Sequence, residues 1–414
     1  MYLFKKLYEQ DVAITVSGIL FIIAAIALAG SHLDAKPSQS IMTAMVWLLP
    51  VIYLFRIKYN FSSGEKLQLV LGCLLFFSAL LSFFSYPEGV DLKPFRTFWL
   101  YLLPLGLVPV LANLKVTKEW LLTILIISGI FSFAVILKDL NSGGVRGWRH
   151  GLPIPYGVIS LTTGLLSLIF FFDRSLNRYW RIALISTFLL AFSGTIWSQT
   201  RGGWLYFALW ASFVASVWLW REASITKKLV ALVVVILVAT VLLQLRPGEI
   251  VQDRIKRAAL EVEMYIDGKA AMSSTGQRFD LWRVAGQVFI ESPITGSGLQ
   301  GFISKRDEML ANHTIALFEN LKHAHNDLLW MASTRGIVGV LVLMFVYIGL
   351  LRFYWRKFSY DETRIYGAAG LTVVCGAMVY GLTDIFMSLK ITIGYFFILN
   401  AILIRLSEQE LQSR

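Results

Sequence analysis

The sequence predicts an all-α, polytopic bundle of membrane helices, with a helical loop domain on one side of the membrane. The chain has 414 residues, of which 57% are hydrophobic and only 15% are charged. Because soluble domains carry about 25% charged residues, this composition excludes a cytosolic, disordered or collagen-like protein. Apolar runs that approach the roughly 20 residues needed to cross a bilayer recur along the chain, and these runs define the expected elements.

Twelve apolar runs predict twelve transmembrane helices. They cover residues 12–30, 41–55, 67–84, 97–112, 119–137, 153–172, 182–199, 203–220, 229–245, 336–353, 366–387 and 391–406. We expect the fourth to be kinked, because it contains Pro104 and Pro109. The chain then divides into helices 1–9 (residues 1–245), a large polar loop (246–322) and helices 10–12 (323–414).

The distribution of Lys and Arg predicts the orientation. If both termini are cytoplasmic, the inner loops and helix ends hold more than twice as many Lys and Arg residues as the short outer loops. Membrane proteins concentrate these residues on the cytoplasmic side. Membrane anchoring therefore explains much of the net charge of +12, and we expect no nucleic-acid partner.

The large loop then lies outside the cytoplasm, which is the periplasm in a bacterium. Within it, residues 251–260 and 279–290 have the apolar spacing of amphipathic helices. Ser292-Pro293 and the segment Gly296-Ser297-Gly298 indicate turns after the second of these helices.

Ionisable side chains are scarce within the expected spans, which disfavours an ion-driven transporter. Asp384, near an outer helix end, is the clear exception. This residue is compatible with a proton relay, with an ion pair to Lys390 and with a helix cap.

Arginines at the outer helix ends are candidates for binding an anion, because guanidinium groups bind phosphate oxygens in bidentate geometry. The candidates are Arg146, Arg149, Arg201 and Arg278. Arg146 and Arg149 are also compatible with snorkelling to lipid headgroups. Arg201 is the stronger candidate, because the two glycines after it would let backbone amides and the guanidinium approach one anion together. Such a cluster would suit the pyrophosphate of a lipid carrier.

Two histidines, His323 and His325, lie where the large loop re-enters the bundle. Imidazole can accept a proton from a hydroxyl group near neutral pH, and Asp327 is a candidate for orienting it. Interfacial hydrogen bonding and metal binding are the alternatives, although no Cys or nearby acidic set completes a usual metal-ligand spacing. We favour His325 as a general base and expect no metal or other cofactor.

These residues form a pattern that resembles the O-antigen ligase and polymerase superfamily. The pattern runs from Ser198 to Gly339 and comprises Arg201-Gly202-Gly203, Gly276-Gln277-Arg278, Pro293-x-x-Gly296-x-Gly298, His325-Asn326 and Gly336. The twelve-span layout, with its large loop between spans nine and ten, resembles the ligases specifically.

The resemblance implies an inverting GT-C-type glycosyltransferase in lipopolysaccharide biosynthesis. Such a ligase moves the O-antigen glycan from undecaprenyl pyrophosphate to a lipid A-core sugar, at the periplasmic face of the bacterial inner membrane and without a metal or nucleotide. The two arginines and the histidine that are essential in these ligases correspond to Arg201, Arg278 and His325, with Arg283 close to the second position. His323, Arg146, Arg149 and Asp327 are further candidates for supporting roles.

Three other functions remain open from the sequence. An O-antigen polymerase would use a second carrier-linked glycan as the acceptor, and a protein O-oligosaccharyltransferase would use a protein such as pilin. A lipid or glycan transporter would catalyse no transfer at all.

Overall fold

The computed structural model describes residues 61–84, 95–112, 114–143, 153–221, 246–267, 273–317 and 321–412, together with Ile26. Over these residues the secondary structure is α-helical with two short 3-10 helices and no strand, so the predicted all-α class is confirmed. The expected spans 12–30 (apart from Ile26), 41–55 and 229–245, and the candidates Arg146 and Arg149, lie outside the described residues.

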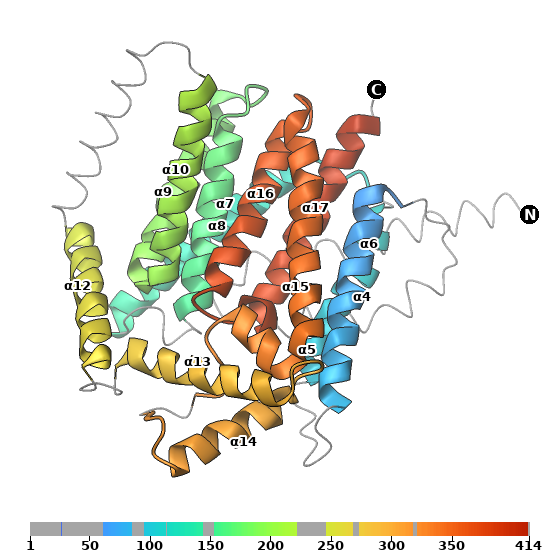
Figure 1. The fold of residues 1–414 in the computed structure, drawn as a ribbon. Helices are drawn as coiled ribbons and strands as arrows, with labels where there is room; N and C mark the ends of the chain where they lie inside the picture. The colour runs from blue at the N-terminus through green and yellow to red at the C-terminus, as the bar shows by residue number, and fades with distance from the viewer. Residues whose placement is uncertain are drawn as a thin grey trace, which may run out of the picture.

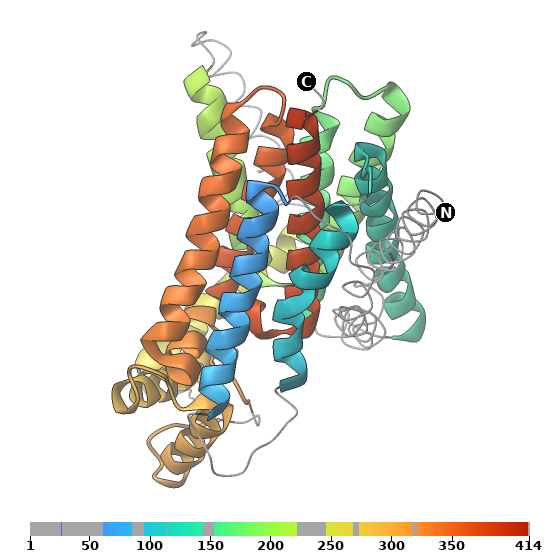
Figure 2. The ribbon, with the colours of Figure 1, turned by 90° about the vertical axis from the view of Figure 1, so that its right-hand side faces the viewer.

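Long helices that match the expected spans stand side by side in a bundle (Figures 1 and 2). They are α4 (Ser63–Phe84), α5 (Phe95–Phe98) with η1 (Trp99–Leu102) and α6 (Leu103–Ala112), α7 (Lys118–Ser142), α8 (Pro153–Phe171), α9 (Arg178–Ser198), α10 (Arg201–Arg221), α15 (Asp327–Ser359), α16 (Arg364–Gly381) and α17 (Lys390–Gln412). Among the described helices, six are long and apolar enough to cross a membrane, namely α4, α7, α8, α9, α15 and α17.

Helix α17 forms the centre of the bundle. It packs against α4, α6, α8 and α16, and its apolar side chains from Ile391 to Leu406 are almost completely buried. On the outer helices, large apolar side chains such as Phe77, Leu189 and Phe345 are exposed. An exposed apolar surface of this kind is unfavourable in water but suits contact with lipid.

Among the helix boundaries that differ from the predicted spans, two lie close to the histidines and Asp384. Helix α15 begins at Asp327 rather than at residue 336, and Gly336 interrupts it with non-helical backbone angles (φ 61°, ψ −158°). The apolar pattern missed the first turns because polar Ser333, Thr334 and Arg335 are buried within the protein there. Helix α16 ends at Gly381 rather than at 387, and η2 (Phe386–Ser388) follows after a turn. Buried Phe386 and Met387 in that segment had extended the apolar pattern past the end of the helix.

The helices of the large loop gather at one end of the bundle, the lower end in Figure 1. They are α12 (Arg246–Ile266), α13 (Ser274–Glu291) and α14 (Gly298–Ala311), and the first two contain the two amphipathic helices predicted. Helix α13 runs across the bundle end and buries one face in a small hydrophobic core of Leu281, Val284, Ala285, Val288, Phe302, Ile315, Ala324, Trp330 and Ile385. This core fixes the loop against the first turn of α15.

The glycine-containing turn after α13 packs its backbone into the break in α15. The Ile337 N–H donates to Pro293 O at 2.8 Å, and the Ser297 N–H donates to Ser333 O at 3.0 Å. A Cβ atom on Gly336 would lie 2.3 Å from the carbonyl carbon of Ile294. Glycine is therefore required at 336 for the close approach as well as for the positive φ.

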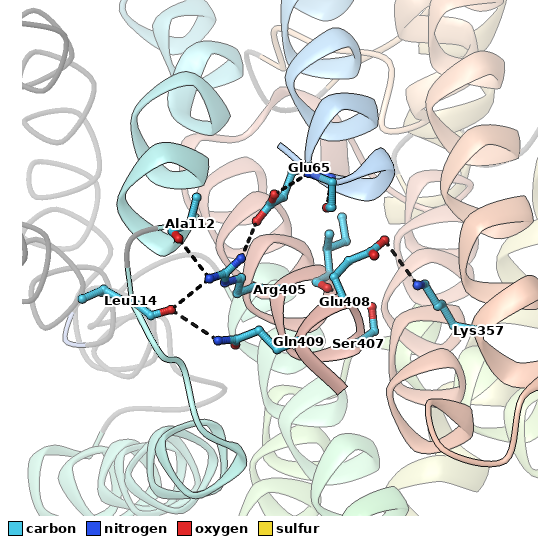
Figure 3. Close-up of polar contacts among 10 residues, drawn as sticks. Glu65, Ala112, Leu114, Lys357, Arg405, Ser407, Glu408 and Gln409 are labelled. Carbon is cyan, nitrogen blue, oxygen red and sulfur yellow. Dashed lines mark hydrogen bonds and ion pairs between the residues drawn. The ribbon is translucent and has the colours of Figure 1, made fainter. Parts of the chain in front are cut away.

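Polar side chains tie α17 to its neighbours at the opposite end of the bundle (Figure 3). Arg405 pairs with Glu65 of α4 (Nη1–Oε1 3.4 Å) and donates to the carbonyl oxygens of Ala112 and Leu114 at 3.0 and 3.3 Å. Lys357 of α15 pairs with Glu408 (Nζ–Oε1 3.3 Å). These contacts join α4, the end of α6, α15 and α17 around two neutralised ion pairs.

Candidate active site

Two histidines and a carboxylate meet at the junction of the large loop and the bundle. The Nδ1 atom of His325 lies 3.1 Å from Oδ1 of Asp384, and Nδ1 of His323 lies 3.9 Å from the same oxygen. The two imidazole ring centroids are 4.1 Å apart. Asp384, which the sequence analysis left as a relay, an ion-pair partner of Lys390 or a helix cap, is the carboxylate beside the histidines.

The Asp384 carboxyl group favours its ionised form. Its burial raises the pKa, but the hydrogen bond and charge of His325 and the N–H of Ile385 outweigh burial and hold the pKa below its usual value. An ionised carboxylate beside Nδ1 favours a proton on that nitrogen and leaves Nε2 as the basic atom of the ring. This is the arrangement that a general base requires.

His323 is held in its neutral form. Burial is the largest cause that lowers its pKa to about 4, and the charges of His325 and Arg278 lower it further, against the opposing effect of Asp384. At neutral pH, His323 therefore adds no positive charge beside His325.

Asp327 binds the backbone of Met387 rather than the side chain of a histidine, which is the partner that the sequence suggested for it. Both of its carboxyl oxygens accept the N–H of Met387, at 3.0 and 2.9 Å. The reason lies in the backbone. Asp327 opens α15 and faces η2, whereas His325 precedes the helix in a left-handed conformation (φ 49°).

Arg201 is the first residue of α10 and reaches toward α12 and the start of α13. Its guanidinium contacts Glu261 with two nitrogens, Nη1–Oε2 at 3.3 Å and Nη2–Oε1 at 3.4 Å, and donates to Thr275 Oγ1 at 3.2 Å. The following glycines have a packing role: a Cβ atom on Gly202 would lie 2.3 Å from Oγ1 of Thr383. They let α10 approach the turn that carries Asp384.

Glu261 is a site residue that sequence reasoning missed. Burial raises the pKa of its carboxyl group, but hydrogen bonds from Thr275 and Arg201 and the charge of Arg201 lower it below the usual value. The resulting carboxylate occupies the guanidinium of Arg201 in the way that two phosphate oxygens would. Glu261 directly follows the predicted amphipathic segment 251–260, and nothing in the sequence distinguished it from the other charged residues nearby.

Arg278 lies close enough to both the histidine group and Arg201 for their charges to interact with its own. Burial lowers its pKa, and the charges that act on it are those of Asp384, Arg201 and Glu261. Ser273 caps its helix, because the hydroxyl oxygen of Ser273 accepts the N–H of Gly276 at 2.9 Å. Within the described ranges no ion pair or hydrogen bond to the Arg278 side chain is present, so its positive charge is available to an anion.

Arg283, the neighbouring alternative, is placed differently. Its side chain is 56% exposed, lies 3.5 Å from Asp280 and donates to Thr314 O at 2.9 Å. Arg278 is therefore the arginine of α13 that faces the cluster.

The histidine group also has the composition of a metal site. One ligand atom from each of His323, His325 and Asp384 lies within 4.8 Å of the others. The spacing of the sequence does not reveal an acidic ligand for the histidines, because Asp384 follows them by about 60 residues and reaches them only through the turn after α16.

The fold and this cluster define a polytopic helical membrane protein with arginines, histidines and carboxylates gathered at one end of the bundle. The family model described as O-antigen ligase matches residues 186–344, which include Arg201, Arg278 and His325. The chain is similar to an O-antigen ligase from Escherichia coli, with 22% identity over 83% of this chain and 82% of the relative. It is also similar to an uncharacterized protein of Haemophilus influenzae, with 21% identity over 80% of this chain and 84% of the relative. These similarities support the resemblance to the O-antigen ligase and polymerase superfamily.

Proposed function

We propose that the chain is a GT-C-type, inverting glycosyltransferase that transfers an O-antigen glycan from undecaprenyl pyrophosphate to a sugar of the lipid A core. The observation that carries the proposal is the convergence of Arg201 and Arg278 with the His325–Asp384 pair at one end of the bundle. Arg201, Arg278 and His325 lie within the segment that matches the O-antigen ligase model, and Asp384 lies beyond it.

Arg201 and Arg278 bind the diphosphate of the donor. When the glycosidic bond breaks, its electron pair remains on the diphosphate oxygen, and the developing charge needs stabilisation. Two guanidinium groups supply positive charge and directed donors for that purpose. The available charge of Arg278 supports this role.

His325 activates the acceptor. Its Nε2 takes the proton from an acceptor hydroxyl as that oxygen attacks the anomeric carbon from the side opposite the departing diphosphate. One displacement inverts the anomeric configuration, and Asp384 stabilises the imidazolium that forms.

We place this end of the bundle at the periplasmic face of the inner membrane. The opposite end carries the basic residues of the helix termini, namely Lys66, Lys118, Arg178, Arg221, Arg356, Lys357, Arg364 and Arg405. A cytoplasmic location of these residues follows the positive-inside rule. Both lipid-linked substrates would then reach the site from the bilayer.

The test is glycan transfer by the purified protein in liposomes with carrier-linked donor and three separate acceptors. Transfer to lipid A core is the expected result. Transfer only to a second carrier-linked glycan would identify a polymerase, and transfer only to pilin would identify a protein O-oligosaccharyltransferase. A lack of transfer to any acceptor, with donor moving across the membrane, would instead support a transporter.

A second candidate role for the histidine group is metal binding, which the spacing of His323, His325 and Asp384 favours. We propose metal-independent transfer, because the two arginines supply the positive charge that the leaving group needs. Activity is therefore expected to survive EDTA. A complete loss that a divalent metal reverses would establish the metal role instead.

A further inference from the structure

The backbone of Met387, three residues after Asp384, is held from both sides. Its N–H donates to both carboxyl oxygens of Asp327 at 3.0 and 2.9 Å. Its carbonyl oxygen accepts a short hydrogen bond from the hydroxyl of Tyr101. All three residues are buried, with exposed fractions of 2% or less. Two side chains from distant parts of the sequence thus fix one peptide segment of η2.

The Tyr101 hydroxyl is itself fixed by Arg335. The Nη2 atom of Arg335 donates to Tyr101 Oη at 3.0 Å, and its Nη1 donates to Ser78 Oγ at 3.3 Å. The guanidinium also lies 5.3 Å from the ring centroids of Phe98 and Tyr101. Arg335 is 3% exposed, so this arrangement is rigid in the sense that a packed core is rigid.

A second contact joins the beginning of α15 to the turn after α16. Asn326 donates from Nδ2 to the carbonyl oxygen of Leu382 at 3.2 Å, while its Oδ1 accepts the N–H of Leu329 and caps α15. The residues directly after His325 therefore hold the chain before and after Asp384. A Cβ atom on Gly381 would lie 2.7 Å from Oδ2 of Asp327, so this glycine permits the close approach.

We propose that Asp327 and Tyr101 are positioning residues that set the contact between His325 and Asp384 by fixing the backbone of Met387. The proposal rests on the proposed function, in which His325 is the general base and Asp384 its partner. Neither Asp327 nor Tyr101 touches the substrate in this role. The left-handed backbone of His325 (φ 49°) is an uncommon state that persists only where the surrounding structure enforces it, and these hydrogen bonds supply that constraint.

Loss of either hydrogen bond should reduce catalysis more than binding. A shift of the Asp384 turn misorients His325 but leaves Arg201 and Arg278 in place for the donor. Because small displacements of catalytic groups cost up to about 100-fold, we expect Asp327→Ala and Tyr101→Phe to lower kcat by about 10- to 100-fold, with little change in the donor KM.

The first test measures kcat, KM and the pH–rate profile of these variants in the liposome assay. Asp327→Asn, which keeps one acceptor oxygen for Met387, should restore much of the activity. Ser78→Ala, which removes a partner of Arg335 but leaves Met387 held, is the matched control and should behave like wild type. In an Asp384→Asn background, adding Asp327→Ala should lower kcat little further, because Asp327 is proposed to act only by positioning Asp384. The proposal would be overturned if the effects of Asp327→Ala and Asp384→Asn on kcat were fully additive. It would also be overturned if the pH–rate profiles of Asp327→Ala and Tyr101→Phe matched that of wild type.

The second test does not depend on transfer activity. The chain has only 5 histidines, so the ¹³C-histidine NMR signal of His325 can be assigned from a His325→Gln variant. Asp327→Ala and Tyr101→Phe should move the chemical shift of this signal in the same direction as Asp384→Asn does. A His325 signal at the wild-type position would refute the positioning role even if the protein transfers no glycan. Failure of transfer by wild type alone would refute only the proposed function.

Discussion

His325 combines a strained backbone with a buried charged neighbour. A non-glycine residue with a left-handed φ of 49° costs about 1–3 kcal/mol, and Asp384 is only 6% exposed. Neither feature stabilises the fold by itself. Both unfavourable features occur at His325. This is expected where a protein gives up some stability to hold an imidazole in a defined position.

Arg201→Lys should impair transfer, with kcat/KM lower by at least about tenfold. Lysine keeps the charge but has a single ammonium group, which cannot reproduce the two-point contact of a guanidinium with phosphate. Arg283→Lys is the matched control, since that arginine is exposed. The measurement is the rate of transfer at several donor concentrations. Wild-type activity of Arg201→Lys would indicate an ordinary interfacial role for Arg201.

His323 should make the folded protein sensitive to acid between about pH 6.5 and 4. Its pKa in the folded protein is about 4, against 6.5 for the unfolded chain. In this range the unfolded chain therefore binds the proton more readily, and the free energy of unfolding falls as the pH falls. Thermal unfolding in detergent should show a smaller loss of stability over this range in His323→Gln than in wild type. Parallel curves would contradict the burial of His323.

At the scale of single residues, the candidates came from side-chain chemistry and from motif resemblance. Arg201, Arg278 and His325 were selected because their side chains suit phosphate binding and proton transfer and because their motifs resemble those of the O-antigen ligases. Asp384 and Glu261 could not be assigned, because one follows the histidines by about 60 residues and the other precedes Arg278 on a separate helix. Only the packing of α12, α13 and the α16–η2 turn brings them to the site.

The helices of the large loop bring a competing carboxylate to the site. Glu261 on α12 contacts both terminal nitrogens of Arg201, which is the surface that a diphosphate needs. In the proposed function, binding of the donor therefore has to displace this carboxylate or share the guanidinium with it.

Glu261→Gln should lower the donor KM by about 2- to 5-fold, because a partly exposed ion pair contributes up to about 1 kcal/mol. Glutamine keeps an acceptor for Thr275 but removes the negative charge. Glu263→Gln, an exposed residue of the same helix, serves as the control. A higher donor KM in Glu261→Gln would mean that Glu261 assists donor binding by holding Arg201 in position.

The break in α15 is a second feature at the scale of elements. Gly336→Ala should destabilise the protein by about 1–3 kcal/mol, since its backbone angles are almost exclusive to glycine and a Cβ would collide with Ile294. Gly349→Ala in the same helix meets only atoms at 3.4 Å or more and should be tolerated. Thermal unfolding of the two variants measures the difference. Equal stabilities would contradict the backbone packing of the glycine-containing turn.

At the scale of the whole molecule, apolar runs predicted the helices but not all of their ends. The runs that became α4, α7, α8 and α9 agree with the structure to within a few residues at most ends, because these helices present apolar faces to lipid. The beginning of α15 and the end of α16 differ, because buried polar residues and a buried turn lie there. The histidines lie just before the first of these positions and Asp384 just after the second, so the periodicity was least informative beside the candidate site.

The two ends of the bundle differ in their charge chemistry. At one end Arg405 and Lys357 are paired with Glu65 and Glu408 (Figure 3), so positive charge is neutralised within the protein. At the other end Arg278 has no such partner among the described residues. An anionic ligand is therefore favoured at the loop end of the bundle and disfavoured at the paired end.

The most direct test of the central claim compares wild type with His325→Ala in liposomes that contain defined carrier-linked donor and lipid A-core acceptor. The measured quantity is the rate of glycan transfer at saturating donor and acceptor. The account predicts that the substitution lowers this rate by about 10²- to 10⁴-fold while pyrophosphate-carrier binding persists. Transfer by His325→Ala at the wild-type rate would contradict it.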